Sequence, residues 1–303
     1  MKKEYIIGTR GSRLALSQTE LVIAELQKAA GLKIIPKVIT TEGDRSQDLS
    51  LRRTTGEGVF VREIESALLR GEIDLAAHSL KDLPVTENPD LTLKAFLKRE
   101  DPREAFLDAD GASFEDLPRG AVIGTSSLRR MVQLQRIKPD CQFRDIRGNI
   151  DTRVRKMEEG QYHGIVLAVA GLKRLGLEGR IRQIFNLSQC LPAAGQGVIA
   201  VQISRDFQDQ EMLQALEIVN NNDTAMAVSA ERSFLKELGG GCRLPIGALA
   251  TVAGSAFYIF GMVADSKGQN ILYHQLAGKI GNPVLAGQRL ADWFLKKGII
   301  DWN

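Results

Sequence analysis

Cys242 stands in an unusual stretch of the sequence, LGGGCRLPIG (238–247). Three glycines precede it and remove side-chain bulk, and Arg243 follows it. The arginine favours a thiolate, whereas the C-terminus of the helix expected before the glycines disfavours one, so the stretch indicates an accessible thiol more than an acidic one. A buried structural cysteine at a glycine-rich helix end is the alternative interpretation.

Three further stretches could bind an anion. GTSSLRR (124–130), RGNIDTR (147–153) and GLKRLG (171–176) each place cationic side chains at a turn after an expected strand. Backbone N–H groups at a helix start and guanidinium groups both bind carboxylates or phosphates. Residues 119–182 hold fourteen Lys and Arg against six Asp and Glu, a net +8, although the whole chain carries only +3. An anionic ligand is therefore expected, with unrelated solvated turns as the alternative.

Two N-terminal stretches, GTRGS (8–12) and HSLKDLP (78–84), also lie at the ends of expected strands. In the second, Asp82 is a carboxylate close to cations, so it would stay ionised and could offset a positive charge on a substrate. An ordinary turn aspartate before a proline is the alternative. His78 is expected to pack within its strand, and its closeness in sequence to Asp82 argues against a hydrolase triad.

Several classes of function are disfavoured by the composition. The three cysteines are widely spaced and no histidine lies near them, which predicts neither disulfides nor a metal site. GQGVIA (195–200) precedes a strand rather than a helix, so it does not predict dinucleotide binding. The basic region contains only Phe143 and Tyr162 as aromatics, so a small polyanion fits better than nucleic acid. Without an apolar run of ~20 residues or a signal-peptide core, we expect a cytoplasmic protein that does not contact membranes.

The order of expected elements predicts a bilobed α/β protein with a hinged cleft. The expected elements alternate β-α-β-α-β through the first 79 residues, and the alternation restarts at 121. Between them, the charged segment 97–107 is expected to cross from the first lobe to the second. A second crossing at 190–197 leads to a strand, 198–204, that should return to the first sheet. A helix, three alternating strands and a final helix then predict a smaller α+β domain. The expected domains are 1–98 with 195–220, 99–194, and 221–303.

Seven stretches together resemble the signatures of one family, hydroxymethylbilane synthase, also called porphobilinogen deaminase. They occur in that family's order and spacing over essentially the whole chain: RGSRLALSQ, EIDLAAHSLKDLP, GTSSLRR, RGNIDTR, AGLKRLG, PAAGQGVIAV and GGGCRLPIGA.

The resemblance implies a fold and an activity. It implies two α/β domains like those of periplasmic binding proteins, forming a cleft, plus a smaller α+β domain. The implied enzyme is a monomeric transferase of tetrapyrrole and heme biosynthesis. It would condense four porphobilinogen molecules head to tail, releasing ammonia from each, to give hydroxymethylbilane. Cys242 matches the cysteine that holds a dipyrromethane cofactor through a thioether, and Asp82 matches the catalytic carboxylate.

Other residues match the family's binding positions. Those resembling cofactor-binding residues are Ser79, Lys81, Thr125, Ser127, Arg129 and Arg130. Those resembling residues of the incoming-substrate and growing-chain sites are Arg10, Ser12, Gln18, Arg147, Arg153 and Arg174. Phe60 matches an aromatic residue of the active-site lid, but Glu57 replaces a lysine common in the family, so that position is not expected to contact the anionic substrate. The alternative function is a non-enzymatic, bilobed receptor for a small anion, which would need neither Asp82 nor an open Cys242.

Overall fold

The computed structural model describes residues 4–40, 61–240, 244–265, 268–279 and 281–299. The chain divides into two compact units. Unit 1 comprises residues 1–99 and 198–225, and unit 2 comprises residues 100–197 and 226–303.

Unit 1 is built on a five-stranded sheet in the order β2-β1-β3-β10-β4. Its strands are β1 (Tyr5–Thr9), β2 (Ile34–Val38), β3 (Leu75–Ser79), β4 (Leu91–Phe96) and β10 (Ile199–Ser204). The first three run parallel, whereas β10 is antiparallel to both β3 and β4. Because of this direction β10 begins beside the end of β3, where Ile199 pairs with Ser79.

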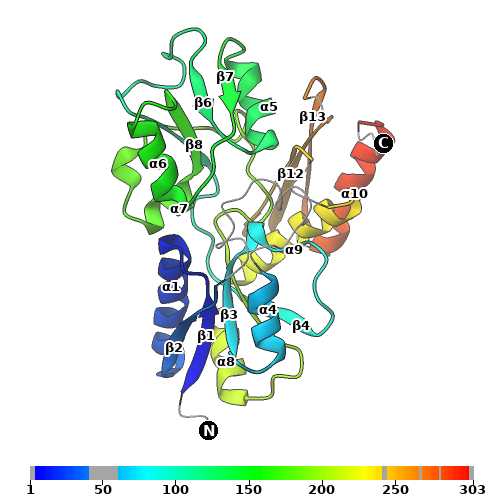
Figure 1. The fold of residues 1–303 in the computed structure, drawn as a ribbon. Helices are drawn as coiled ribbons and strands as arrows, with labels where there is room; N and C mark the ends of the chain where they lie inside the picture. The colour runs from blue at the N-terminus through cyan, green and yellow to red at the C-terminus, as the bar shows by residue number, and fades with distance from the viewer. Residues whose placement is uncertain (1–3, 41–60, 241–243, 266–267, 280, 300–303) are drawn as a thin grey trace. The chain divides into compact units, whose positions relative to one another are not determined.

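Helices cover both faces of this sheet (Figure 1). Helices α1 (Arg13–Ala30) and α8 (Gln210–Val219) pack on one face, and α4 (Arg62–Leu69) packs on the other. Alternation along β3 explains the division, since Leu75 and Ala77 join the first core and Ala76 joins the second. The carboxyl ends of β1 and β3 are left open to hold polar side chains.

Unit 2 contains a second five-stranded sheet, in the order β7-β6-β8-β5-β9. Its strands are β5 (Glu104–Asp108), β6 (Val122–Gly124), β7 (Gln142–Arg144), β8 (Gly164–Ala168) and β9 (Gln183–Ile184). Its helices are α5 (Leu128–Ile137), α6 (Ile150–Glu158) and α7 (Val169–Arg174). Strands β6, β7 and β8 are parallel, and β5 is antiparallel to β8, so β5 begins at the edge where β6 and β8 end.

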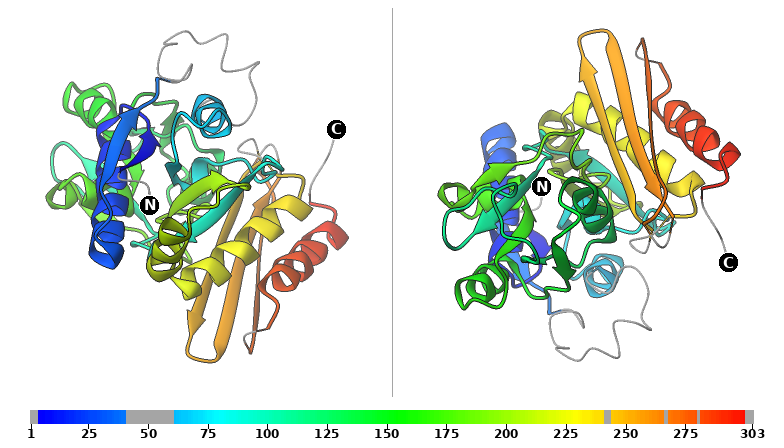
Figure 2. Two further views of the ribbon diagram at one scale, coloured as in Figure 1. Left: turned by 90° about the horizontal axis from the view of Figure 1, so that it is seen from below. Right: turned by 90° about the horizontal axis from the view of Figure 1, so that it is seen from above.

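The C-terminal part of unit 2 is a three-stranded antiparallel sheet with two helices (Figure 2). Its elements are α9 (Asn222–Glu237, of which residues 226–237 belong to unit 2), β11 (Ile246–Ala253), β12 (Ala256–Ala264), β13 (Ile271–Lys279) and α10 (Pro283–Lys296). Both helices pack on one face of the sheet, where Phe234 and Phe294 are fully buried. On the other face Val132 of α5 packs against Leu249 and Met262, so α5 rests on this sheet.

The predicted fold class of two α/β sheets and a smaller antiparallel sheet with helices is confirmed, as is the return of the strand at 198–204 to the first sheet. The crossing predicted at 97–107 was partly wrong, because its second half belongs to β5. The cleft and the domain boundaries stay predictions. Among the described residues, no helix combines the length and the apolar character that crossing a membrane requires.

Candidate active site

A pocket opens in unit 1 at the carboxyl ends of β1 and β3. Its polar lining consists of Arg10, Ser12, Gln18, His78, Ser79 and Asp82. These side chains come from the turn after β1, the first turns of α1 and the end of β3. Ligands of open α/β sheets bind at such an edge, where successive strand ends converge.

Local hydrogen bonds fix the side chains at this edge. Ser12 caps α1, where its Oγ accepts the N–H of Ala15 at 3.3 Å. The buried amide of Gln18 is hydrogen-bonded to Ser79, with its Nε2 2.8 Å and its Oε1 3.0 Å from the serine Oγ. Ser12 and Gln18 therefore shape the pocket as well as line it.

Asp82 ends a short 3₁₀ helix, Leu80–Asp82, that follows β3 directly. Leu80 donates its N–H to the carbonyl of Val198 at 3.0 Å, which ties this turn to the start of the returning strand. The Asp82 side chain is exposed, whereas Lys81 is half-buried. An exposed carboxylate held on a braced turn can meet a substrate without first leaving a protein partner.

His78 lies beneath this turn and is buried. Its Nε2 is 3.1 Å from Oε1 of Gln202, whose Nε2 donates to Glu65 Oε1 at 2.9 Å. Burial lowers the pKa of His78 to about 4, so the ring is neutral at physiological pH. The prediction that His78 packs within its strand is confirmed.

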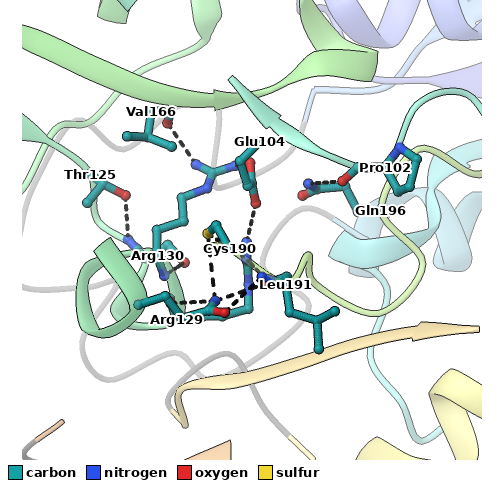
Figure 3. Close-up of polar contacts among 11 residues, drawn as sticks. Pro102, Glu104, Thr125, Arg129, Arg130, Val166, Cys190, Leu191 and Gln196 are labelled. Atoms are coloured by element: carbon teal, nitrogen blue, oxygen red, sulfur yellow. Dashed lines mark hydrogen bonds and ion pairs between the residues drawn. The ribbon is translucent and has the colours of Figure 1, made fainter. Parts of the chain in front are cut away.

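The anion-binding stretch at 124–130 forms a buried charge cluster in unit 2. Figure 3 shows the Glu104 carboxylate between the guanidinium groups of Arg129 and Arg130. Arg129 Nη2 lies 2.5 Å from Glu104 Oε1, and Arg130 Nη2 lies 2.7 Å from Oε2. Both arginines are 6% exposed and the glutamate is fully buried. Two cations therefore share one anion away from water.

One donor in this cluster lacks a partner. Arg129 Nη1 donates to the carbonyl of Leu191 at 2.6 Å, and Arg130 Nη1 donates to that of Val166 at 2.9 Å. The buried Nε of Arg130 has no hydrogen-bond partner. An unpaired buried donor and an uncompensated positive charge both cost free energy, and the carboxylate of a ligand would remove both costs.

Two hydroxyl groups precede these arginines. Thr125 is buried, and its Oγ1 accepts the N–H of Ser127 at 3.2 Å. Ser127 caps α5, where its Oγ accepts the N–H of Arg130 at 3.4 Å. The caps are the local reason that α5 begins here, and they place both arginines within its first turn.

The other predicted binding arginines of unit 2 occupy separate turns. Arg147 is 3.7 Å from Asp145, and Arg153 Nε donates to the carbonyl of Gly148 at 2.9 Å. Arg174 Nη2 donates to the carbonyl of Gly197 at 2.6 Å, and burial lowers the pKa of Arg174 to about 10. The structure thus groups Arg129 with Arg130 but gives Arg147, Arg153 and Arg174 different partners.

Cys242, Phe60 and Glu57 lie outside the described residues. The other two cysteines, Cys141 and Cys190, are free and buried, and burial raises the pKa of Cys190 to about 12. Sequence reasoning passed over Glu104, which bridges Arg129 and Arg130, and Gln202, which links His78 to Glu65. Glu104 had no local signal, because its partners are 25 and 26 residues further along the chain.

Two family models match the chain. One, described as porphobilinogen deaminase, dipyromethane cofactor binding domain, covers residues 5–214, and the other, described as the porphobilinogen deaminase C-terminal domain, covers residues 225–296. The chain belongs to the porphobilinogen deaminase family. A porphobilinogen deaminase of Roseiflexus sp. is 46% identical over 98% of both chains. That of Syntrophotalea carbinolica is 45% identical over 96% of this chain and 92% of its own length.

Among solved structures, the VFT2 domain of Bordetella pertussis BvgS, as a double mutant, is similar over 76% of this chain and 93% of its own length. Its TM-score is 0.42 and its sequence identity is 17%.

Family membership gives the chain porphobilinogen deaminase activity, a place in tetrapyrrole biosynthesis and a dipyrromethane-binding domain. It thereby decides between the enzyme and the non-enzymatic anion receptor in favour of the enzyme. The residues fit the cofactor, because each of its pyrrole rings carries carboxylates and the cluster at Arg129 and Arg130 has a buried N–H without a partner.

Proposed function

We propose that Cys242 holds the dipyrromethane through a thioether and that Asp82 is the catalytic carboxylate of the deaminase. With the dipyrromethane as primer, the enzyme would join four porphobilinogen molecules head to tail to give the linear tetrapyrrole hydroxymethylbilane. The observation that carries the proposal is the unpartnered Nε of Arg130 in a buried cluster with one excess positive charge. Such a cluster suits a carboxylate-bearing ligand and would be costly without one.

The residues proposed to hold the cofactor are those that can donate hydrogen bonds to its carboxylates. Arg130 offers its Nε, and Arg129 beside it adds a second guanidinium. The other residues proposed for this role are Ser79, Lys81, Thr125 and Ser127. When bound, the dipyrromethane supplies the pyrrole carbon to which the next pyrrole is joined.

Asp82 acts on the substrate. Its exposed carboxylate would accept hydrogen bonds from pyrrole N–H groups and carry negative charge beside the cation that develops as ammonia leaves. A fixed opposite charge at that point lowers the barrier because it binds the developing ring cation more tightly than the uncharged pyrrole ring of the substrate. The same oxygens can take up and return the protons of the reaction.

The remaining cations bind the acidic substrate and chain. We assign this role to Arg10, Arg147, Arg153 and Arg174, with Ser12 adding a hydroxyl. We assign Gln18 to the same binding site, where its amide, hydrogen-bonded to Ser79, also holds the pocket wall. Porphobilinogen is the small-molecule partner that family membership implies. A monomeric state and a cytoplasmic location complete the proposal.

Intact-mass spectrometry tests the proposal. The chain, isolated from a host that makes porphobilinogen, should be heavier than its sequence by one dipyrromethane. Cys242→Ser should lose the increment, whereas Cys141→Ser and Cys190→Ser are matched controls that should keep it. A folded wild-type chain at its sequence mass, or an increment that survives in Cys242→Ser, would overturn the attachment.

A further inference from the structure

We infer that Glu104 is a positioning residue, which holds Arg129 and Arg130 in the geometry that receives the carboxylates of the dipyrromethane. The inference rests on the proposed function, since it assigns a task within the same site. Glu104 itself does not touch the ligand in this scheme; it acts through the two guanidinium groups.

The topology of the sheet brings Glu104 to the site. It is the first residue of β5, and it pairs with Ala168 at the end of β8. Because β5 runs antiparallel to β8, its start lies at the edge where the parallel strands end and α5 begins. The carboxylate thus reaches the first turn of α5 from a strand, a more rigid support than a loop.

The burial of the three side chains makes them interdependent. Glu104 is fully buried, and Arg129 and Arg130 are 6% exposed. A carboxylate removed from water in this way requires cationic partners, and two adjacent guanidinium groups repel each other unless an anion lies between them. Glu104 therefore compensates one of the two positive charges and leaves the other for a ligand.

Each guanidinium is held at two points. One Nη of each arginine contacts Glu104, and the other Nη donates to a backbone carbonyl, that of Leu191 for Arg129 and that of Val166 for Arg130. Two contacts on different nitrogens fix the plane of a guanidinium as well as its position. The Nε of Arg130 is left without a partner in this fixed plane.

Two alternative roles for Glu104 predict different rates of cofactor acquisition when Glu104 is replaced. A purely structural lock would affect stability but not the rate at which a folded chain acquires its cofactor. A competitor for the guanidinium groups would slow cofactor acquisition, so its removal would accelerate this step. The contacts favour positioning, because Glu104 occupies one nitrogen of each arginine and leaves Arg130 Nε without a protein partner.

The experiment measures cofactor loading in folded protein. Wild type, Glu104→Gln and Glu104→Asp are prepared in a host that cannot make porphobilinogen, and folding is checked by circular dichroism. Each is then incubated with porphobilinogen, and the fraction carrying the mass increment is followed with time. Asp108→Asn is the matched control, since Asp108 is a buried carboxylate at the other end of β5 whose Oδ1 accepts the N–H groups of Asp110 and Ala112.

We expect Glu104→Gln to load at least about tenfold more slowly than wild type, since one partner of a buried ion-pair cluster is lost. Glu104→Asp should recover part of the rate, and Asp108→Asn should load like wild type. Equal or faster loading by folded Glu104→Gln, or no recovery by folded Glu104→Asp, would overturn the role of Glu104. A wild-type chain that acquires no increment would instead overturn the proposed function itself.

A structure of the loaded wild-type protein decides the matter if Glu104→Gln does not fold. Glu104 should remain within hydrogen-bond distance of both guanidinium groups while Arg130 Nε meets a carboxylate of the dipyrromethane. Displacement of Glu104 from either arginine in the loaded state would overturn the inference.

Discussion

The Ser79 hydroxyl and the Gln18 side-chain amide are hydrogen-bonded to each other in unit 1, at 2.8 Å and 3.0 Å. The first residue ends β3 and the second lies on α1, so the pair ties together two walls of the same pocket. Gln18 is buried, and therefore the loss of Ser79 would leave its amide unsatisfied.

Ser79→Ala should lower the free energy of unfolding by about 1–3 kcal/mol, because it leaves the buried side-chain amide of Gln18 without its hydrogen-bond partner. It should also reduce kcat/KM for porphobilinogen, since Asp82 follows Ser79 on the same turn. Denaturant unfolding and steady-state rates measure the two effects. The double-mutant cycle with Gln18→Ala should give a coupling of about 0.5 kcal/mol or more. Strictly additive single-mutant effects would contradict a direct interaction.

Asp82→Asn should lower kcat for ammonia release by roughly a hundredfold or more, because the amide keeps the shape but removes the charge. Its side chain is exposed, so the free energy of unfolding should change by no more than about 0.5 kcal/mol. Asp90→Asn, another exposed aspartate of unit 1, is the control and should keep normal activity. Near-normal ammonia release by Asp82→Asn would refute the role given to Asp82.

His78 should make unit 1 sensitive to acid. Burial lowers the pKa of the folded ring from 6.5 to about 4, so the unfolded chain takes up the proton first as the pH falls. The stability associated with the neutral ring is complete above pH 6.5 and declines as the pH falls to about 4, by roughly 3 kcal/mol. Chemical unfolding of wild type and His78→Gln across this range measures the difference. An unchanged slope in His78→Gln would contradict the assignment.

The buried thiols should be unreactive in the folded chain. Thiolates are the nucleophilic form, and burial raises the pKa of both Cys141 and Cys190, that of Cys190 to about 12. Folded Cys242→Ser should therefore resist iodoacetamide at neutral pH and take up two equivalents once unfolded, as mass spectrometry can count. Rapid labelling before unfolding would be inconsistent with this burial.

Site residues could be predicted from the sequence where they lie close together along the chain. The serines and arginines of residues 124–130 lie within one helix turn, so their spacing was enough to predict a helix start rich in cations. Glu104 could not be found in this way, because its position depends on the antiparallel pairing of β5 with β8. The role of Cys242 came from the resemblance, since the residues alone left a structural cysteine open.

Helix α8 and strand β5 were not predicted from the sequence, and only the helix had a local sequence signal. Helix α8 carried a usable signal, since Asp209 caps it and Met212, Ala215 and Leu216 follow at helical spacing. Strand β5 was hidden by the charged residues before it, which indicated a crossing. Gln202 looks like any strand residue, and only the packing of β10 against β3 brings it to His78.

The place of β10 in the sheet has a consequence for biosynthesis. A ribosome that has made the first hundred residues has supplied four of the five strands of unit 1, but the gap between β3 and β4 is filled only by residues 199–204. At translation rates of roughly 5–20 residues per second, the nascent sheet waits for several seconds with both edges of that gap unpaired. Unpaired strand edges are sites of aggregation, so the first hundred residues are at risk of it until residue 204, about twice as far along the chain, has emerged.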